Sequence, residues 1–268
     1  MLTKQSRIDS VINVSTIRVS IVGVKDFDVS ELKISAADNY PELPNIRLGK
    51  QIERVFSALI QNSSNYTIIK ENVQIIDDKI TIGEVDFIIK NNETNVISHL
   101  EIVYKFYLYD PNQSSIELEK WIGPNRKDSF IEKFNKLKSK QFPLLYKLKT
   151  ADVLNDLDIK SLQQKLCFMA SLFVPFSRLN KPFPLINNAA IIGYWLTYND
   201  FKVQIKSNAQ YYLPKKHEWG IAPKDNSEWY SFSEISLKIE ESLNRQFSPL
   251  CWIKTSELTY EQCFIVWW

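Results

Sequence analysis

The sequence predicts an α/β (α+β) fold in which helices flank a mixed central sheet. In its first two thirds an amphipathic helix, three strands, a second helix and a further strand follow one another, and this order is typical of layered α/β proteins. The chain has 268 residues, of which 44% are hydrophobic and 24% charged. These values are ordinary for a globular protein with one large or two small domains. The formal net charge of +2 gives no indication about nucleic acid.

Three regions differ in character. Residues 1–45 form an extension, and alternation in places over residues 11–35, as at Thr16–Ile21, predicts a strand or two. Residues 46–180 carry the clearest periodicity and form the predicted α/β core. Residues 181–268 hold six of the seven tryptophans and form a C-terminal elaboration or subdomain. We expect these tryptophans mainly to anchor the core, because large aromatic side chains bury much apolar area.

The core elements follow from hydrophobic spacing. Residues 46–61 predict a helix because five apolar side chains recur at i, i+3, i+4, i+7 and i+8, namely Ile52, Val55, Phe56, Leu59 and Ile60. A strand is expected over 66–76, and an apolar run over 166–174 predicts a buried strand that ends at Pro175.

Three further helices are expected along the chain. Ser129 and Glu132 match a capping box that begins a helix over 129–141, limited by Pro143 and burying Phe130, Phe134 and Leu137. Residues 152–163 are expected to be helical, and so are residues 231–247.

The most informative segment is a predicted hairpin that joins Gly83–Phe87 to Leu100–Lys105 through the polar loop Asn92–Asn95. If Asn91 and Val96 flank this loop, Asp86 lies opposite Glu101 and Ile82 lies opposite Lys105. Since side chains alternate across a sheet, one face then carries Glu84, Asp86, Glu101 and Lys105. The other face is apolar and consists of Val85, Phe87, Ile89, Leu100, Ile102, Tyr104 and Phe106.

Opposed carboxylates on this hairpin suggest a metal site. Asp86 and Glu101 would repel each other across the strands, and a bridging divalent cation would remove that penalty. Acids and a lysine beside a metal suit phosphodiester hydrolysis. The alternative is that the polar face is simply solvated, as in many hairpins, and a slip of one residue in register would separate the two acids.

Motifs along residues 46–220 resemble a known superfamily. The order of Glu53 on a helix, then Asp86, then Glu101 with a nearby lysine, then a helix resembles the PD-(D/E)XK nucleases. More narrowly, the chain resembles a bacterial family of uncharacterised proteins, domain of unknown function 1853, which is usually grouped with that superfamily. The segments that carry this resemblance are Leu48–Glu53, Gly83–Phe87, Leu100–Leu108 and Gly123–Asp128, with weaker likeness at Leu172–Pro175, Trp195 and Trp219.

The resemblance implies a restriction-endonuclease-like core with an acidic site on its sheet. It implies Asp86, Glu101 and the Ile102 carbonyl as ligands of Mg²⁺ or Mn²⁺, with Lys105 as the catalytic amine. Glu53 would contribute from the first helix through water, although a helix-edge glutamate is as often solvated.

One spacing departs from the superfamily pattern. The usual motif is Glu-x-Lys, whereas this chain has Glu101-x-x-x-Lys105, and Val103 stands where the usual lysine would stand. Glu84, predicted opposite Val103, then serves either as a third metal ligand or as the partner that neutralises Lys105. A catalytically inactive module that binds nucleic acid or a protein partner is the alternative function.

A basic segment follows the hairpin. Between residues 126 and 149 eight lysines and arginines face two acids, and such a patch can attract DNA or RNA. The candidate contacts are Arg126, Lys127, Lys133, Lys136 and Lys140, together with His99, which shares the face of Glu101. A solvated lysine face is the plainer interpretation of this segment, and a solvated or hydrogen-bonded imidazole is that of His99.

The remaining features concern the setting of the protein. Three separated cysteines form no disulfide framework or metal-ligand pair, which indicates a reducing, cytoplasmic location. No signal peptide or membrane-spanning segment is expected. The apolar end, residues 264–268, is expected to dock against the body or against a second subunit, so a homodimer is compatible with the sequence.

Overall fold

A long mixed sheet forms the frame of the molecule. The structure is a computed structural model that describes residues 3–34, 40, 46–183, 185–205 and 208–268. Ten strands of the described chain form one sheet in the order β2-β3-β4-β6-β7-β10-β9-β8, to which β1 adds beside β6 and β5 beside β4. The pairs β4/β6, β6/β7 and β7/β10 are parallel, and the other neighbours in this order are antiparallel. The predicted fold class, a mixed central sheet flanked by helices, is therefore confirmed.

The bounds of the elements are as follows. The helices are α1 (Lys4–Ile12), α2 (Leu48–Gln61), α3 (Phe130–Lys136), α4 (Phe142–Leu144), α5 (Leu148–Val153), α6 (Tyr198–Val203) and α7 (Phe232–Asn244). The strands are β1 (Val24–Asp26), β2 (Tyr66–Asp77), β3 (Ile80–Asn91), β4 (Ile97–Tyr109), β5 (Trp121–Ile122), β6 (Gln163–Pro175), β7 (Ile191–Thr197), β8 (Gln210–Tyr212), β9 (Leu250–Lys254) and β10 (Tyr260–Val266). A π-helical turn, η3 (Leu137–Gln141), joins α3 to α4.

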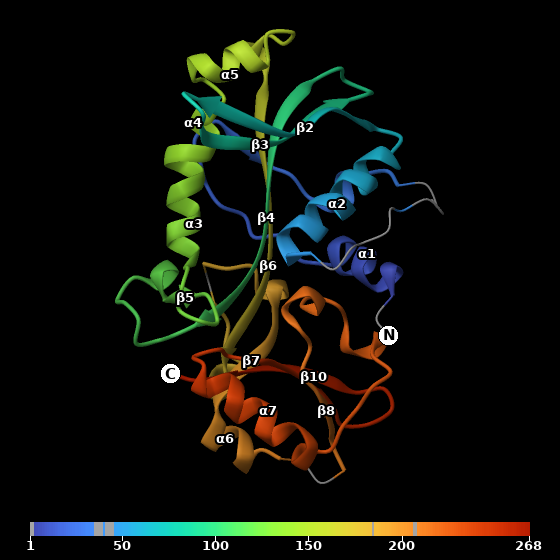
Figure 1. Cartoon of the computed structure of the whole chain (residues 1–268), viewed down its shortest axis with the longest axis vertical. Coiled ribbons are helices and arrows are strands. Elements are labelled where there is room, and N and C mark those ends of the chain that lie inside the picture. Colours follow the sequence, from blue (N-terminus) through green and yellow to red (C-terminus); the bar gives the residue numbers. More distant parts are fainter. Residues whose placement is uncertain (1–2, 35–39, 41–45, 184, 206–207) are drawn as a thin grey trace.

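The two central strands are covered on both faces. Figure 1 shows β4 and β6 running through the middle of the molecule, with α1 and α2 on one side and α3 on the other. The predicted apolar stripe of α2 packs with Phe87, Leu100 and Ile102 in one core. On the opposite face, Phe130 and Leu137 pack with the core that contains Val103. Since helices cover both faces, a polar side chain on β4 is not automatically solvated.

The C-terminal region extends the same sheet. Strands β7 and β10 pair in parallel, and β9 and β8 follow with α6 and α7 packed against them (Figure 1). Trp219 and Trp252 are fully buried, so the prediction of the C-terminal tryptophans as core anchors is confirmed for these two. The chain end docks against the body, because the ring of Trp268 lies 5.0 Å from that of Trp195.

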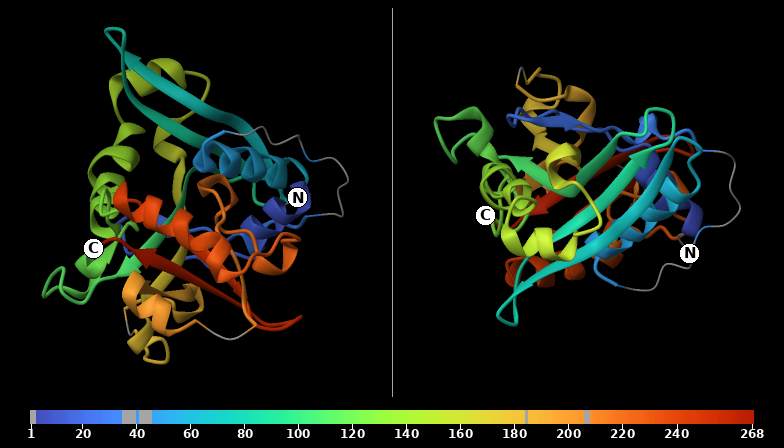
Figure 2. Two further views of the ribbon diagram at one scale, coloured as in Figure 1. Left: turned by 60° about the horizontal axis from the view of Figure 1, so that its bottom comes forward. Right: turned by 90° about the horizontal axis from the view of Figure 1, so that it is seen from above.

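The tip of the β2–β3 hairpin projects from the fold. Figure 2 shows this tip reaching beyond the neighbouring helices. Ile76 and Ile80 near this tip are 52% and 68% exposed. The base of the hairpin lies in the core, so the segment that carries Asp86 is anchored while its tip is in solvent.

One local prediction is confirmed in part and another is wrong. Of the strand or two expected over residues 11–35, β1 forms at Val24–Asp26, whereas Thr16–Ile21 contributes only a single bridge at Thr16. Helix α1 precedes both. The expected helix over 152–163 is wrong, because α5 ends at Val153 and only one short turn follows at Ile159–Ser161. The polar residues at 155–156 favour turns over a continuous helix. Residues 35–39 and 41–45 of the predicted extension lie outside the described part.

Among the described residues, no helix combines the length and the apolar character that crossing a membrane requires.

Two glycines give a test of how β7 and β10 pack. A Cβ atom added at Gly193 of β7 would lie 2.2 Å from the backbone oxygen of Gln262, whereas one added at Gly49 would meet nothing within 4 Å. We expect Gly193→Ala to lower the free energy of unfolding by about 1–3 kcal/mol or more, because the backbones must separate. Gly49→Ala should raise it by about 0.5–1 kcal/mol through helix propensity. Urea unfolding of both variants measures this, and equal effects would contradict the described packing.

Candidate active site at the separation of β3 and β4

The candidate site lies where β3 and β4 separate. Asn91 donates its N–H to the Val96 oxygen at 2.9 Å, and the strands pair from Lys90–Ile97 to Phe87–Leu100. The predicted register is therefore confirmed for this stretch. Beyond it β3 pairs with β2 and β4 pairs with β6. The predicted pairing of Ile82 with Lys105 is wrong, because the strands have already diverged there.

Where the β3–β4 ladder ends, the Asp86 side chain accepts a hydrogen bond from β4 in place of a backbone partner. The Ile102 N–H donates to Asp86 Oδ2 at 2.9 Å. Ile102 thus contributes its amide N–H to the site, whereas the resemblance implied its carbonyl oxygen as a metal ligand. The chain also crowds the far side of β3, since a Cβ atom at Gly83 would lie 2.5 Å from Leu144 Cδ2 of α4. Packing of α4 against β3 accompanies the divergence of the two strands.

Glu101 is a fully buried carboxylate with two side-chain partners. Its side chain and that of His99 are both 0% exposed, and His99 Nε2 lies 2.8 Å from Glu101 Oε1. Gln141 donates from Nε2 to Glu101 Oε2. The solvated-face interpretation is therefore wrong for Glu101. His99 is equally inaccessible, packed against the ring of Phe142, and its predicted contact with nucleic acid is wrong for this reason.

The amine beside the acids comes from α3. Lys133 Nζ donates to Gln141 Oε1 at 2.6 Å, so a hydrogen-bonded path joins Lys133 through Gln141 to Glu101. Burial lowers the pKa of Lys133, and attraction to Glu101 and Asp86 opposes this decrease. Lys133 was predicted as a surface contact for nucleic acid, and its side chain is half-buried and interacts electrostatically with the two carboxylates.

Lys105, the amine suggested by the resemblance, is engaged elsewhere. Lys105 Nζ donates to Asp128 Oδ2 at 2.6 Å, and the two side chains are 37% and 43% exposed. It lies further along β4 after the strands have separated. It remains close enough to Lys133 for their repulsion to contribute to the lowered pKa of Lys133.

Glu53 and Glu84 meet at a third lysine. Lys50 Nζ lies 2.5 Å from Glu53 Oε2 and 3.1 Å from Glu84 Oε1. The predicted role of Glu84 as partner of Lys105 is therefore wrong, because Lys50 of α2 takes that place. Burial raises the pKa of Glu53. Glu53 also reaches Asp86 electrostatically, since it contributes to the raised pKa of Asp86.

The electrostatic centre of the site is the pair of acids. Burial and then repulsion from Glu101 raise the pKa of Asp86 well above its usual range, while the Ile102 N–H and Lys133 act in the opposite direction. Two neighbouring carboxylates that share a poorly solvated place have this effect, because both cannot ionise without repulsion. Asp86 therefore holds a proton more readily than an ordinary aspartate.

The donor set decides which metal coordination the site can support. Within the described ranges, no three His, Cys, Asp or Glu side chains lie together as a metal-holding group, so the suggested third ligand from Glu84 is absent. Asp86 Oδ1 has no hydrogen-bond partner among the described residues, and Glu101 already accepts two bonds. Mg²⁺ is commonly held by one or two carboxylates plus water and substrate phosphate oxygens. Two acids fit that coordination and do not fit a cage built of protein ligands alone.

The basic segment is divided by the fold. Arg126 donates to Asp110 at 2.9 Å and to Gln113 at 2.6 Å, and it lies over the ring of Trp268. This arginine is thus a structural partner of the chain end. Lys127, Lys136 and Lys140 are exposed, as both sequence interpretations require.

Gln141 was missed at the level of the sequence. Glutamine carries no titratable group, and its partner Glu101 lies forty positions away. For Lys133 a signal does exist, since it stands three residues after Phe130 and four before Leu137 and so shares their buried stripe. A lysine in an apolar stripe indicates a buried amine with an acidic partner.

Comparisons with known proteins identify a family and no function. The model of the family described as Domain of unknown function (DUF1853) matches residues 20–266, so the chain belongs to this family. The match begins earlier and ends later than the resemblance over 46–220. No curated protein and no solved structure matches the chain.

The raised pKa of Asp86 predicts a pH-dependent stability. Between the unfolded pKa, about 3.9, and the higher folded value, the folded state binds more protons than the unfolded state. Stability therefore falls as pH rises through this window. We expect Asp86→Asn to remove this loss, so that the variant gains on the order of 1 kcal/mol over the wild type at pH 8 and little at pH 4. Thermal or urea unfolding across pH measures the difference.

A matched control is Asp156→Asn. Asp156 is exposed beside Lys70, whose hydrogen bond lowers the pKa of Asp156. This substitution should produce no gain at pH 8. A gain equal to that of Asp86→Asn would assign the effect to net charge instead of to the buried acid pair.

Proposed function

We propose that this member of the DUF1853 family is a nuclease-like hydrolase that cleaves phosphodiester bonds in DNA or RNA with the help of a divalent cation. The observation that carries the proposal is the gathering of Asp86, Glu101 and Lys133 from three different elements at the separation of β3 and β4. Burial raises the pKa of Asp86 and lowers that of Lys133, and such displaced groups beside a further carboxylate are typical of catalytic sites.

The fold supports the same proposal. The sheet is mixed, helices cover both of its faces at β4, and the two acids come from neighbouring strands. These features support a restriction-endonuclease-like core, which the resemblance to the PD-(D/E)XK superfamily implies, as part of the proposal. We place the chain in that superfamily as part of the proposal.

Lys133 replaces Lys105 as the proposed catalytic amine. Lys133 interacts electrostatically with both acids, whereas Lys105 is paired with Asp128. The four-residue separation of Glu101 and Lys105 then has a simple explanation. The amine that β4 does not supply next to Glu101 comes from α3.

Each residue has a defined task in this proposal. Bound at Asp86 and Glu101, Mg²⁺ or Mn²⁺ would supply Lewis-acid stabilisation of phosphate charge and a more acidic water. The ammonium group of Lys133 stabilises negative charge that develops on the non-bridging phosphate oxygens. Gln141 holds Lys133 and Glu101 in fixed positions, and His99 orients the Glu101 carboxylate from behind.

One observation favours the second candidate, a binding module without catalysis. Glu101 is fully buried and both of its oxygens are hydrogen-bonded, which suits a structural centre. In this alternative the chain keeps the fold and binds nucleic acid or a protein partner without cleaving it.

The decisive experiment is cleavage of radiolabelled single- and double-stranded DNA and RNA with Mg²⁺ or Mn²⁺. We expect Asp86→Asn and Lys133→Met each to lower the cleavage rate by about 10²-fold or more, because charge stabilisation in the transition state is lost. Lys105→Met should lower it by at most about tenfold. A larger loss from Lys105→Met than from Lys133→Met would restore the strand lysine as the catalytic amine.

Titration with Mn²⁺ by calorimetry separates the two candidate functions. A hydrolase should bind Mn²⁺ in the presence of an oligonucleotide, and Asp86→Asn should weaken that binding at least tenfold. Glu241→Gln, which removes a carboxylate from exposed α7, is the matched control and should leave it unchanged. Oligonucleotide binding with no Mn²⁺ effect and no cleavage would identify the binding module.

A further inference from the structure

A cavity of about 580 Å³ opens next to the candidate site. It lies between the first turn of α2, the middle of β4 and the loop around residues 214–219. Its side chains include four basic or imidazole groups, one carboxylate and a buried indole, namely Arg47, Lys105, Lys216, His217, Asp128 and Trp219.

Positive charge in this cavity is not balanced by the protein. Its single carboxylate, Asp128, is paired with Lys105 at 2.6 Å. The side chains of Arg47 and His217 have no hydrogen-bond or ion-pair partner in the part of the chain that the structure describes. Lys216 lies over the Trp219 ring at 5.8 Å. Cations gathered in a hollow raise the local positive potential, which an anionic ligand lowers.

The cavity is held in a fixed shape by the buried side chain of Arg7. Arg7 donates to the Trp219 oxygen at 2.8 Å and to the His217 oxygen at 2.5 Å. These bonds tie the loop that carries His217 and Lys216 to helix α1. A preorganised loop loses less conformational entropy when a ligand binds.

Two chain segments, the first turn of α2 and the middle of β4, connect this cavity with the candidate site. Gly49 of α2 lines it, and the next residue, Lys50, bridges Glu53 and Glu84. On β4, Lys105 lines it and lies near enough to repel Lys133. A strand whose scissile bond lay at Asp86 and Glu101 would therefore pass this cavity.

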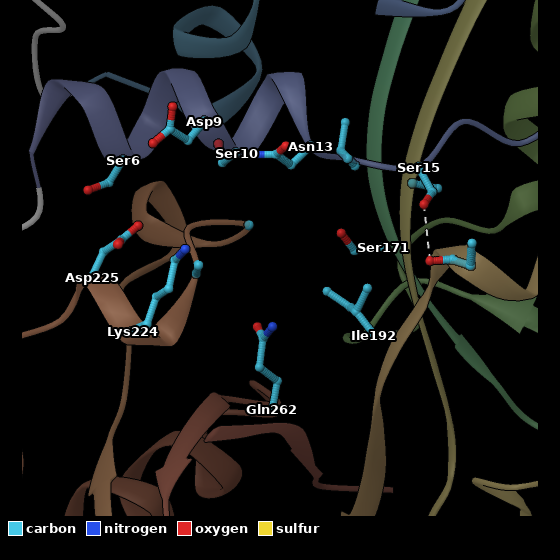
Figure 3. A pocket seen from close by; sticks show the side chains of 15 residues that line it. Ser6, Asp9, Ser10, Asn13, Ser15, Ser171, Ile192, Lys224, Asp225 and Gln262 are labelled. Atoms are coloured by element: carbon cyan, nitrogen blue, oxygen red, sulfur yellow. Dashed lines mark hydrogen bonds between the residues drawn. The ribbon is translucent and has the colours of Figure 1, made fainter. Parts of the chain in front are cut away.

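A second cavity serves as a comparison. Figure 3 shows this space of about 450 Å³ between α1, Ser171 and the turn that carries Lys224, with Gln262 extending toward it from β10. Its lining contains two carboxylates, Asp9 and Asp225, and one cation, Lys224. Its charge balance does not favour an anion, so unpaired basic charge is specific to the first of the two cavities.

We propose that the cavity lined by Arg47, Lys216 and His217 binds a phosphate group of a nucleic-acid strand and thereby holds the strand beside Asp86 and Glu101. This inference rests on the proposed function of the adjacent site. The phosphate is either an internal phosphodiester or a terminal phosphomonoester. Guanidinium, ammonium and imidazole groups recognise both through charge-assisted hydrogen bonds.

The test measures binding of ten-nucleotide single strands in EDTA, so that no cleavage occurs. The double variant Arg47→Gln/Lys216→Gln should weaken binding at least tenfold and reduce the slope of log Kd against log salt by about 1–2. Arg47→Lys should keep most of the affinity. The matched control, Lys181→Gln/Lys224→Gln, removes two exposed lysines elsewhere and should change affinity less than threefold. Thermal unfolding verifies that all variants fold.

The oligonucleotide ends distinguish the two sources of phosphate. Strands with a 5′-phosphate, a 3′-phosphate or only hydroxyl ends are compared. A tenfold preference for one terminal phosphate that disappears in the double variant identifies a terminal site, and equal binding of all three identifies an internal phosphodiester. Equal weakening by the double variant and by its control would overturn the proposal, because binding would then depend on overall charge alone.

The phosphate site and the proposed hydrolase activity can be rejected independently of each other. Suppose that the wild type binds the oligonucleotides, that the double variant weakens this binding, and that no metal ion supports cleavage. This outcome would reject the hydrolase and retain the phosphate site. Where cleavage occurs, the double variant should raise KM at least fivefold and change kcat less than twofold. A loss confined to kcat would place these residues in catalysis and reject the strand-holding role.

Discussion

The buried carboxylate of Glu101 is the constraint on which the rest of the site depends. A carboxylate without solvent must be hydrogen-bonded and electrostatically compensated, or its burial becomes very unfavourable. Here His99 and Gln141 bond its two oxygens, and Lys133, which donates to Gln141, attracts the carboxylate electrostatically. The α3–η3 segment is therefore bound to β4 by polar contacts as well as by its apolar stripe. The wider π-helical turn that ends at Gln141 changes the phase of the side chains relative to a regular helix, and π turns often occur at functional positions.

The separation of β3 from β4 explains why two neighbouring acids behave so differently. Glu101 stays on a strand that β6 continues to pair, so it remains inside the sheet and under the helices. Asp86 stands one position beyond the β3–β4 ladder and bonds the Ile102 N–H in place of a backbone partner. Its other oxygen has no such bond among the described residues. Glu101 is thus held by hydrogen bonds at both oxygens, whereas Asp86 has one oxygen without such a bond and a raised pKa.

Features that depend on local periodicity could be predicted from the sequence, whereas features that depend on packing between distant segments could not. The stripe of α2 and the register of the β3–β4 hairpin follow from spacing and loop length, and both agree with the structure. The point at which β3 and β4 diverge does not follow from spacing or loop length. The divergence accompanies the packing of Leu144, from a distant segment, against Gly83. For the same reason, the sequence alone could not predict that Lys133, instead of Lys105, accompanies the two acids. Only the position of Lys133 between Phe130 and Leu137 marked it as a half-buried lysine.

Stability alone does not account for the polar centre. Buried charged clusters are often no more stabilising than apolar side chains of similar size, and the acid pair itself opposes folding at neutral pH through mutual repulsion. An apolar contact between α3 and β4 would fill the same space without that penalty. The cluster also lies beside a cavity with unpaired basic groups, whereas a purely structural centre has no need of such a neighbour. Acids that repel each other and cations without partners are both relieved by one kind of ligand, a phosphate group accompanied by a divalent cation. The adjacency of these two opposite charge imbalances is therefore the strongest reason to regard this part of the sheet as a working site.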